Sequence, residues 1–273
     1  YIILGDVKKE SIQSFALFAL WIFIFDDTID QKNIIKKSEK EFKNVLDYYL
    51  KIINDSNYEN KNFASFNKKF ENFDLLKKIL KNISNEISTK KNKDYFIYSM
   101  ELFFNKTFEE FILRKENKKI SARKYLNLRS IAGGTDVSCE LAFLLLNLNL
   151  SFKIREDSIF KKIKNKAYKA LIIANDILSF NKEKINNEFA NNYLTIINNE
   201  KKQNEAEIQL MALKKYNQYI IELQQLKTLL LANPYFSSLA EKNEIEQAIQ
   251  IIFCHVQIHL NWALKSSRYL VRP

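Results

Sequence analysis

The chain has 273 residues, of which 47% are hydrophobic, so it can bury a sizeable core as one large domain or two small ones. Only three Gly and two Pro occur, which argues against all-β and α/β folds and favours long helices with short polar connections. The net charge of +11 suits nucleic acid or an anionic membrane. However, the Lys residues are scattered among Asn and Ile, without a compact Arg cluster. We therefore expect no nucleic-acid binding, although a basic field could steer an anion towards a cleft.

Hydrophobic periodicity predicts the following elements in chain order. Helices are expected over 11–29, 39–53, 67–88, 94–114 and 156–181, with a long apolar segment over 122–150, one helix or two over 193–231 and a last helix over 240–271. Polar connections are expected over 54–63, 117–121 and 186–192, with Ser121 as a candidate N-cap. No linker or repeat divides the chain, so the simplest prediction is one all-α domain over 1–273.

The adjacent glycines Gly133 and Gly134 interrupt the longest apolar segment. Each glycine costs roughly 1 kcal/mol inside a helix. The pair therefore predicts a helix break.

Location and redox state follow from the cysteines and the most apolar stretch. Cys139 and Cys254 are too few for a disulfide framework or a zinc site, and they are predicted to be buried thiols. Ile12–Phe25 is shorter than the roughly 20 residues that span a bilayer, so we predict a buried helix without stable membrane insertion. No signal peptide is visible, and a cytoplasmic location is expected.

The first group of chemically active residues is Asp26, Asp27 and Asp30, directly after the apolar helix. Asp26 and Asp30 stack one turn apart on one helix face, where like charges repel unless a cation or solvent relieves them. Carboxylate oxygens suit Mg²⁺, which keeps several waters and bridges to phosphates. The alternative is a solvated acidic helix end, which opposes the helix dipole.

The second group is Asn175, Ser179 and Glu183, which are spaced i, i+4 and i+8 along one helix face. An amide oxygen, a hydroxyl and a carboxylate form a three-oxygen chelate for a small hard cation. Asp176 lies beside this line, and Lys182 could reach a phosphate oxygen. A chance polar stripe is the alternative, since Asn is common in this chain.

Together the two groups resemble the aspartate-rich motif and the second metal motif of microbial-type class I terpene synthases, including the Lys directly before the Glu. The resemblance implies an all-α helical barrel whose mouth is flanked by the two motifs. It also implies three Mg²⁺ ions, with Mn²⁺ as a possible substitute, that bind the substrate diphosphate. The implied metal ligands are Asp26, Asp27, Asp30, Asn175, Ser179 and Glu183.

A further match lies upstream of the second motif. The family carries a diphosphate-sensing Arg 46 positions before the metal-binding Asn, and Arg129 stands at that separation from Asn175. In the family a helix break follows, and its backbone carbonyl points at the reacting carbon. The resemblance implies Gly133 as this effector and Ala132 as the linker, although the linker is frequently polar in relatives.

The last match lies near the end of the chain, where the family has an Arg-Tyr pair on its last helix. Arg268 and Tyr269 match it. The Arg fork and the Tyr hydroxyl can both donate hydrogen bonds to phosphate. The implied diphosphate-binding residues are therefore Arg129, Lys182, Arg268 and Tyr269.

The implied activity is that of a carbon–oxygen lyase acting on a prenyl diphosphate. The cation formed when diphosphate leaves is held in an aromatic cavity, since aromatic faces stabilise positive charge, and is quenched by proton loss or water. Candidate lining residues, for each of which core packing is an equal alternative, are Phe23, Phe103, Phe104, Phe143 and Trp262. His255 is interpreted as a packed core residue and not a base. Farnesyl diphosphate is the default substrate and geranylgeranyl diphosphate the next, with a cyclic hydrocarbon or alcohol as product.

Two alternatives and two open points remain. A chain-elongating prenyltransferase shares the fold but carries a second aspartate-rich motif where this chain has Asn175, Ser179 and Glu183. A non-catalytic basic helical binding protein, for nucleic acid or a membrane surface, is the non-enzyme alternative. A homodimer is left open. Because relatives carry one or two helices before the aspartate motif, we expect N-terminal residues to be missing and the barrel wall to be incomplete.

Overall fold

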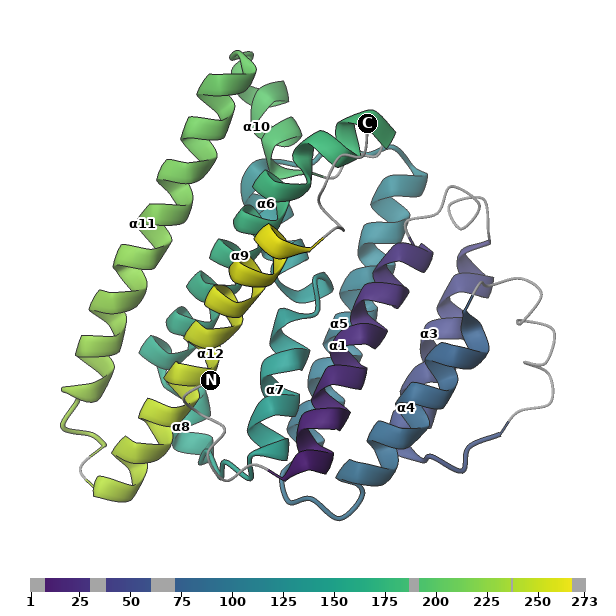
Figure 1. Ribbon diagram of the computed structural model, residues 1–273, viewed down its shortest axis with the longest axis vertical. Helices are drawn as coiled ribbons and strands as arrows, with labels where there is room; N and C mark the ends of the chain where they lie inside the picture. The colour runs from purple at the N-terminus through teal and green to yellow at the C-terminus, as the bar shows by residue number, and fades with distance from the viewer. Residues whose placement is uncertain (1–7, 30–37, 60–71, 187–191, 237, 267–273) are drawn as a thin grey trace. The chain divides into compact units, whose positions relative to one another are not determined.

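The computed structural model describes residues 8–29, 38–59, 72–186, 192–236 and 238–266, and the regular structure within these ranges is α-helical (Figure 1). The helices belong to two compact units. Unit 1 comprises Tyr1–Lys118 and Asp136–Leu148, and unit 2 comprises Lys119–Thr135 and Asn149–Pro273. The all-α fold class is thus confirmed, whereas the single domain over 1–273 stays a prediction.

Unit 1 is built from helices that pack through aromatic and aliphatic side chains. Its helices are α1 (Lys9–Ile29), α3 (Glu39–Asn54), α4 (Phe73–Ile87), α5 (Lys93–Lys115) and α7 (Thr135–Leu145). Helix α4 packs against α1 and α3, and α3 packs against α5. Helix α3 begins with a capping box, because the Ser38 side chain accepts from the Glu41 N–H and the Glu41 carboxylate accepts from the Ser38 N–H.

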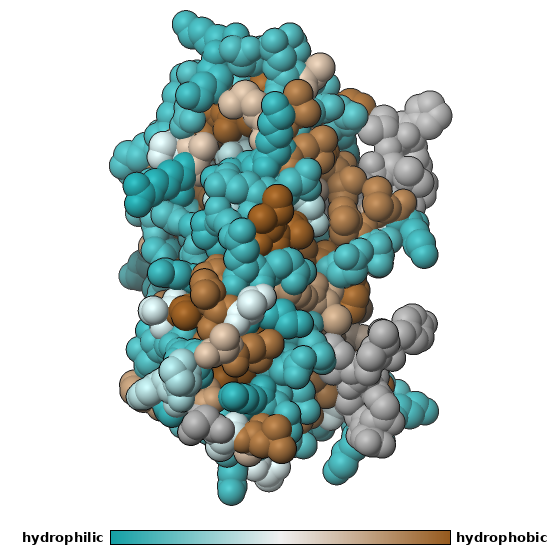
Figure 2. Space-filling view, turned by 90° about the vertical axis from the view of Figure 1, so that its left-hand side faces the viewer, coloured by the Kyte–Doolittle hydropathy of each residue, from teal (hydrophilic) through white to brown (hydrophobic). Residues whose placement is uncertain are grey.

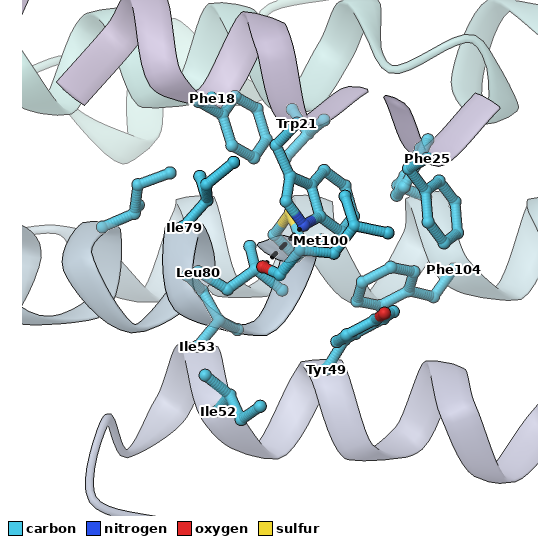
Figure 3. Packing of buried hydrophobic residues seen from close by; sticks show 14 of the residues in the cluster. Phe18, Trp21, Phe25, Tyr49, Ile52, Ile53, Ile79, Leu80, Met100 and Phe104 are labelled. Carbon is cyan, nitrogen blue, oxygen red and sulfur yellow. Dashed lines mark hydrogen bonds between the residues drawn. The ribbon is translucent and has the colours of Figure 1, made fainter. Parts of the chain in front are cut away.

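Trp21 lies at the centre of the unit 1 core (Figure 3). Its ring stacks on Phe25 at 4.8 Å between centroids and meets Phe104 edge-on at 6.0 Å. Its indole Nε1 donates to the Leu76 carbonyl oxygen at 3.1 Å, which satisfies the one polar atom of a fully buried side chain. The residues directly before the aspartate motif are therefore held by packing.

Helix α1 is longer than the stretch Ile12–Phe25 that the hydropathy pattern singled out. Its 21 residues are long and apolar enough to cross a membrane by length and composition, with a mean hydropathy of 1.5 over the most apolar window. A core helix meets the same criterion, and Phe18, Trp21 and Phe25 are buried in the unit 1 core. The prediction of a buried helix is confirmed only for this face, because 28% of the most apolar window is buried and Leu20 is exposed. The absence of membrane insertion stays a prediction.

Unit 2 surrounds a long central helix. Its helices are α6 (Ala122–Ala132), α8 (Phe152–Glu156), α9 (Ser158–Asn186), α10 (Tyr193–Lys201), α11 (Glu205–Leu231) and α12 (Leu239–Lys265). Helix α9 packs against each of the other five. Asp157 starts α9, since its carboxylate accepts from the N–H groups of Ile159 and Phe160 at 2.8 and 2.9 Å. Helix α11 carries exposed apolar side chains such as Leu213 and Ile221. On the face shown in Figure 2, hydrophobic residues lie between hydrophilic ones.

Two predicted boundaries are confirmed, and the end of the predicted helix 156–181 is wrong, because α9 continues to Asn186. The glycine pair separates α6 from α7, and Ser121 caps α6 by accepting from the Lys124 N–H. The segment 193–231 forms two helices, because Lys202 adopts a left-handed conformation with φ 54° that ends α10. Helix α12 ends at Lys265, before the predicted end, because Ser266 is extended, and residues 267–271 lie outside the described residues.

Candidate active site

The second motif lies on α9 in unit 2, and its side chains differ in burial. Asn175 and Glu183 are half-buried, whereas Ser179 is only 5% exposed. The Ser179 hydroxyl oxygen is buried and has no hydrogen-bond partner among the described residues. A buried hydroxyl without a partner costs roughly 1–3 kcal/mol. The buried hydroxyls of Thr107 in unit 1 and Thr195 in unit 2 are likewise without a described partner, whereas Ser179 lies within the predicted chelate.

Asp176, next to this stripe, is a hub of hydrogen bonds within unit 2. Its Oδ2 accepts from the Tyr125 hydroxyl at 2.7 Å and from the Tyr193 backbone N–H at 2.8 Å. These bonds tie α6 and the start of α10 to α9. Burial, reinforced by the Glu183 carboxylate, raises the pKa of Asp176 to about 7, against the lowering effects of the Tyr193 N–H, Arg129 and Tyr125.

Glu183 is held by Asn192, the residue that precedes α10. The Asn192 side-chain amide donates to Glu183 Oε2 at 3.0 Å and to the Asp176 carbonyl oxygen at 2.8 Å. Its own Oδ1 accepts from the Leu194 N–H at 2.8 Å and so caps α10. The buried Asn192 side chain thus connects the first turn of α10 to Asp176 and to Glu183 on α9.

Arg129 on α6 lies beside the same motif. Its positive charge lowers the pKa of Asp176, which places the guanidinium within electrostatic reach of that carboxyl. Helix α6 packs against α9, and Arg129 is half-buried. The structure therefore places Arg129 on a helix that packs against α9, and its role as diphosphate sensor stays a prediction.

The glycine break after Arg129 also contacts α9. A Cβ on Gly133 would lie 2.7 Å from Ile172 Cδ1 and 2.8 Å from the Arg129 carbonyl oxygen, so this position admits no larger residue without a shift. Gly134 has φ 75°, a conformation that L side chains rarely adopt. Gly133 thus allows the close approach of α9 at Ile172, whereas Gly134 allows a backbone with positive φ.

The first motif lies in unit 1, at the last described turn of α1. Asp27 is exposed and Asp26 half-buried, while the Thr28 hydroxyl between the motif positions donates to the Ile24 carbonyl oxygen at 2.7 Å. Asp30, Arg268 and Tyr269 lie outside the described residues. Lys182 is half-buried on α9, directly before Glu183.

The candidate lining residues have varied surroundings. Phe103 and Phe104 are buried in the unit 1 core, where both rings contact Trp21 and Phe25. These contacts favour core packing over cavity lining for both residues. Phe143 on α7 is fully buried and Phe23 half-buried. Trp262 on α12 is 37% exposed, with its ring 6.1 Å from that of His259.

His255 on α12 fits its interpretation as a packed residue. Its Nδ1 lies 3.1 Å from the Ile251 carbonyl oxygen, which can only accept, so Nδ1 carries the proton. Burial lowers the pKa of His255, although the hydrogen bond to Ile251 opposes this. The neutral form is therefore favoured in the folded protein.

The donor set of α9 suits a hard divalent cation better than a transition metal. Among the described residues, no group of three His, Cys, Asp or Glu side chains is placed to hold a metal ion. The oxygen donors Asn175, Ser179 and Glu183 include one carboxylate, and Mg²⁺ typically takes few protein ligands and keeps its waters. The buried Ser179 oxygen and this donor chemistry fit Mg²⁺.

Three residues of this network, Asn192, Tyr193 and Tyr125, belong to none of the motifs that the sequence predicts. A signal for Asn192 was present, because an Asn directly before the apolar run Tyr193-Leu194-Thr195-Ile196-Ile197 has the pattern of an N-cap. Nothing local marked Tyr125, which reaches Asp176 only through the packing of α6 on α9.

Comparison with known proteins places these features in context. Residues 17–219 match the model of the family described as terpene synthase family 2, C-terminal metal binding. A viridiflorene synthase of Cyclocybe aegerita is 28% identical over 109 residues, which cover 40% of this chain and 28% of that protein. The match thus spans less than a third of that relative's length.

The fold is shared with solved structures over nearly the whole chain. A variant of cucumene synthase superposes with a TM-score of 0.80 at 13% identity, covering 98% of this chain and 85% of the other. Germacradien-4-ol synthase from Streptomyces citricolor gives a TM-score of 0.78 at 12% identity, covering 97% and 81%. At such identities the likeness establishes the helical fold.

Proposed function

The chain belongs to terpene synthase family 2, and on this premise we propose that it is a Mg²⁺-dependent class I terpene synthase. It removes diphosphate from a linear prenyl diphosphate and cyclises the cation to a terpene hydrocarbon or alcohol. Farnesyl diphosphate is the favoured substrate and geranylgeranyl diphosphate the next. A cytoplasmic location belongs to the same proposal.

The single observation that carries the proposal is the buried, unpartnered Ser179 oxygen in the middle of an oxygen stripe. A chance polar stripe on a helix faces solvent, or its members bond to one another. Here the central hydroxyl is shielded from water, while Glu183 is oriented by Asn192 and Arg129 lies nearby. Such an arrangement suits a site whose missing partners are a cation and an anion.

The residues that would hold the metal are Asn175, Ser179 and Glu183 in unit 2, with Asp26, Asp27 and Asp30 from the first motif. When bound, Mg²⁺ supplies positive charge that stabilises the leaving diphosphate.

The protein's own groups perform the remaining tasks. Arg129, Lys182, Arg268 and Tyr269 donate hydrogen bonds to the diphosphate oxygens and disperse their negative charge. The Gly133 carbonyl, at the break between α6 and α7, offers a fixed dipole to the cation formed at the reacting carbon. Such preorganised dipoles cost no reorganisation when charge develops.

Product analysis with matched variants tests the proposal. Purified protein with Mg²⁺ is given ten-, fifteen- and twenty-carbon prenyl diphosphates, and gas chromatography is expected to detect a terpene from at least one. Asn175→Ala and Glu183→Ala should abolish this product while circular dichroism stays helical. Asn181→Ala, at an exposed position on the same helix, should retain it. Undiminished product from the first two variants would rule out the metal assignment.

A further inference from the structure

We propose that Asn192 is a positioning residue that holds the Glu183 carboxylate in place to receive a divalent cation. This inference rests on the proposed function, because it assigns Glu183 as a metal ligand. It concerns a residue outside both metal motifs, on the far side of the connection between α9 and α10.

The contacts of Asn192 are complete and buried. The side chain is 0% exposed, and its amide nitrogen donates to Glu183 Oε2 at 3.0 Å and to the Asp176 carbonyl oxygen at 2.8 Å. Its Oδ1 accepts from the Leu194 N–H at 2.8 Å. All three polar functions of this amide, two donors and one acceptor, thus have partners of the right kind.

The orientation of this amide is determined by its neighbours. The Leu194 N–H can only donate, so the atom facing it must be the oxygen. The NH₂ group must then face Glu183 and the Asp176 carbonyl, both of which accept. Turning the amide over would place donor against donor and acceptor against acceptor.

Asn192 itself is fastened to α9 by the next residue. The Tyr193 N–H donates to Asp176 Oδ2 at 2.8 Å, and the Tyr125 hydroxyl donates to the same oxygen at 2.7 Å. Asp176 is 3% exposed, so its carboxyl serves as an anchor that connects α6 and α10 to α9. The start of α10 thus forms a platform beside the Asn192 amide, which the Tyr193 N–H fastens to α9.

Glu183 is a ligand that gains from such a platform. Ordering a Glu side chain on metal binding costs rotamer entropy of up to about 2 kcal/mol. The nearby Asp176 carboxyl also repels the Glu183 carboxylate when both are charged. A neutral amide donor restrains one carboxylate oxygen and leaves the negative charge of Glu183 unchanged. A Lys or Arg in the same place would neutralise that charge and so compete with the cation.

The chain offers a matched pair of capping residues for the test. Asn204 caps α11, where its Oδ1 accepts from the Glu207 N–H at 3.0 Å, but it is exposed and lies outside the metal motifs. Asn192→Ser keeps a hydroxyl that can cap α10 but loses the donor to Glu183. Asn204→Ser makes the same change at a cap without a metal ligand.

The experiment measures binding of Mn²⁺ to the substrate-free protein in the presence of inorganic diphosphate, by electron paramagnetic resonance. Loss of a residue that orients a metal ligand typically weakens metal affinity by 10–100-fold. Asn192→Ser is expected to weaken Mn²⁺ binding by about this factor, whereas Asn204→Ser leaves it unchanged. If Asn192→Ser fails to fold, Asn192→Thr, which also keeps a capping hydroxyl and lacks the amide donor, is measured instead.

A double-mutant cycle separates positioning from general support of the fold. In a Glu183→Gln background, Asn192→Ser is expected to cause little further loss of Mn²⁺ affinity, because the two changes act through one carboxylate. Equal Mn²⁺ affinity of wild type and Asn192→Ser would overturn the role of Asn192 but not the proposed function. The same holds if the losses of Mn²⁺ affinity from Asn192→Ser and Glu183→Gln are fully additive. Failure of the wild type to bind Mn²⁺ with diphosphate would overturn the proposed function as well.

Discussion

Two buried serines, one in each unit, have the same chemistry but different surroundings. Ser84 on α4 is 4% exposed and donates to the Ile53 carbonyl oxygen at 3.0 Å, so its hydroxyl joins α4 to α3 within unit 1. Ser179 on α9 is 5% exposed, and its hydroxyl has no partner among the described residues. The hydroxyl of the first serine joins two helices, whereas the hydroxyl of the second has no described partner.

The same contrast extends to the surroundings of the two serines. Around Trp21, unit 1 is an aromatic core in which the buried indole N–H is satisfied by a backbone carbonyl (Figure 3). Around Asp176, unit 2 encloses a network of tyrosine, asparagine and carboxyl groups. Burial thus encloses a single satisfied polar atom around Trp21, whereas it encloses several hydrogen-bonded polar groups around Asp176.

The largest expected effect comes from the aromatic core. Trp21→Ala should lower the free energy of unfolding by roughly 3–5 kcal/mol, because it leaves a cavity and frees the Leu76 carbonyl. Urea denaturation measures this loss. Leu20→Ala, at an exposed neighbour on α1, should change it by less than about 0.5 kcal/mol. Similar losses for both variants would show that the Trp21 side chain contributes little to this core.

A smaller effect is expected from the polar network. Tyr125→Phe removes the hydroxyl that donates to Asp176 and leaves the ring in place, so it should cost roughly 1–3 kcal/mol of unfolding free energy. Thermal unfolding of the metal-free protein measures this cost. Tyr98→Phe, at an exposed position on α5, serves as the control. A variant as stable as wild type would mean that this hydrogen bond does not hold α6 to α9.

The two serines test the comparison directly, because only one of the two substitutions should destabilise the metal-free protein. Ser84→Ala loses a buried hydrogen bond and should destabilise the protein by about 1 kcal/mol. Ser179→Ala removes a hydroxyl without a partner and should leave the metal-free protein as stable as wild type or slightly more so. The same Ser179 variant should lose Mg²⁺-dependent turnover. Equal destabilisation by both substitutions would show that Ser179 is satisfied within the protein.

The smallest expected effect depends on pH. The folded protein lowers the pKa of His255, so the unfolded chain takes up a proton first as the pH falls through about 6.5. The contribution of this residue to stability is therefore present at higher pH and lost with falling pH. His255→Asn keeps a donor for the Ile251 carbonyl but cannot titrate. Between pH 8 and 5.5, the melting temperature should fall less steeply for this variant than for wild type. Parallel plots of melting temperature against pH would contradict a lowered pKa of His255 in the folded protein.

Much of the fold followed from local patterns in the sequence. The helix starts at Ser38 and Ser121 and the break at Gly133-Gly134 depend on caps and backbone preferences of a few adjacent residues. The end of the last helix was missed, because an extended Ser266 is not marked by a glycine or a proline. The separation of α10 and α11 was left open, since no breaker residue precedes the left-handed Lys202.

The sequence by itself determined the all-helical class, the position of the oxygen stripe on α9 and the family. These depend on residue type and on helical spacing, which local interactions set. Only the tertiary structure decided that Ser179 is buried without a partner, that Asp176 is an anchor and that Asn192 reaches back to Glu183. Hydrogen bonds between α9 and its neighbouring elements depend on how helices pack, and no local pattern encodes that packing.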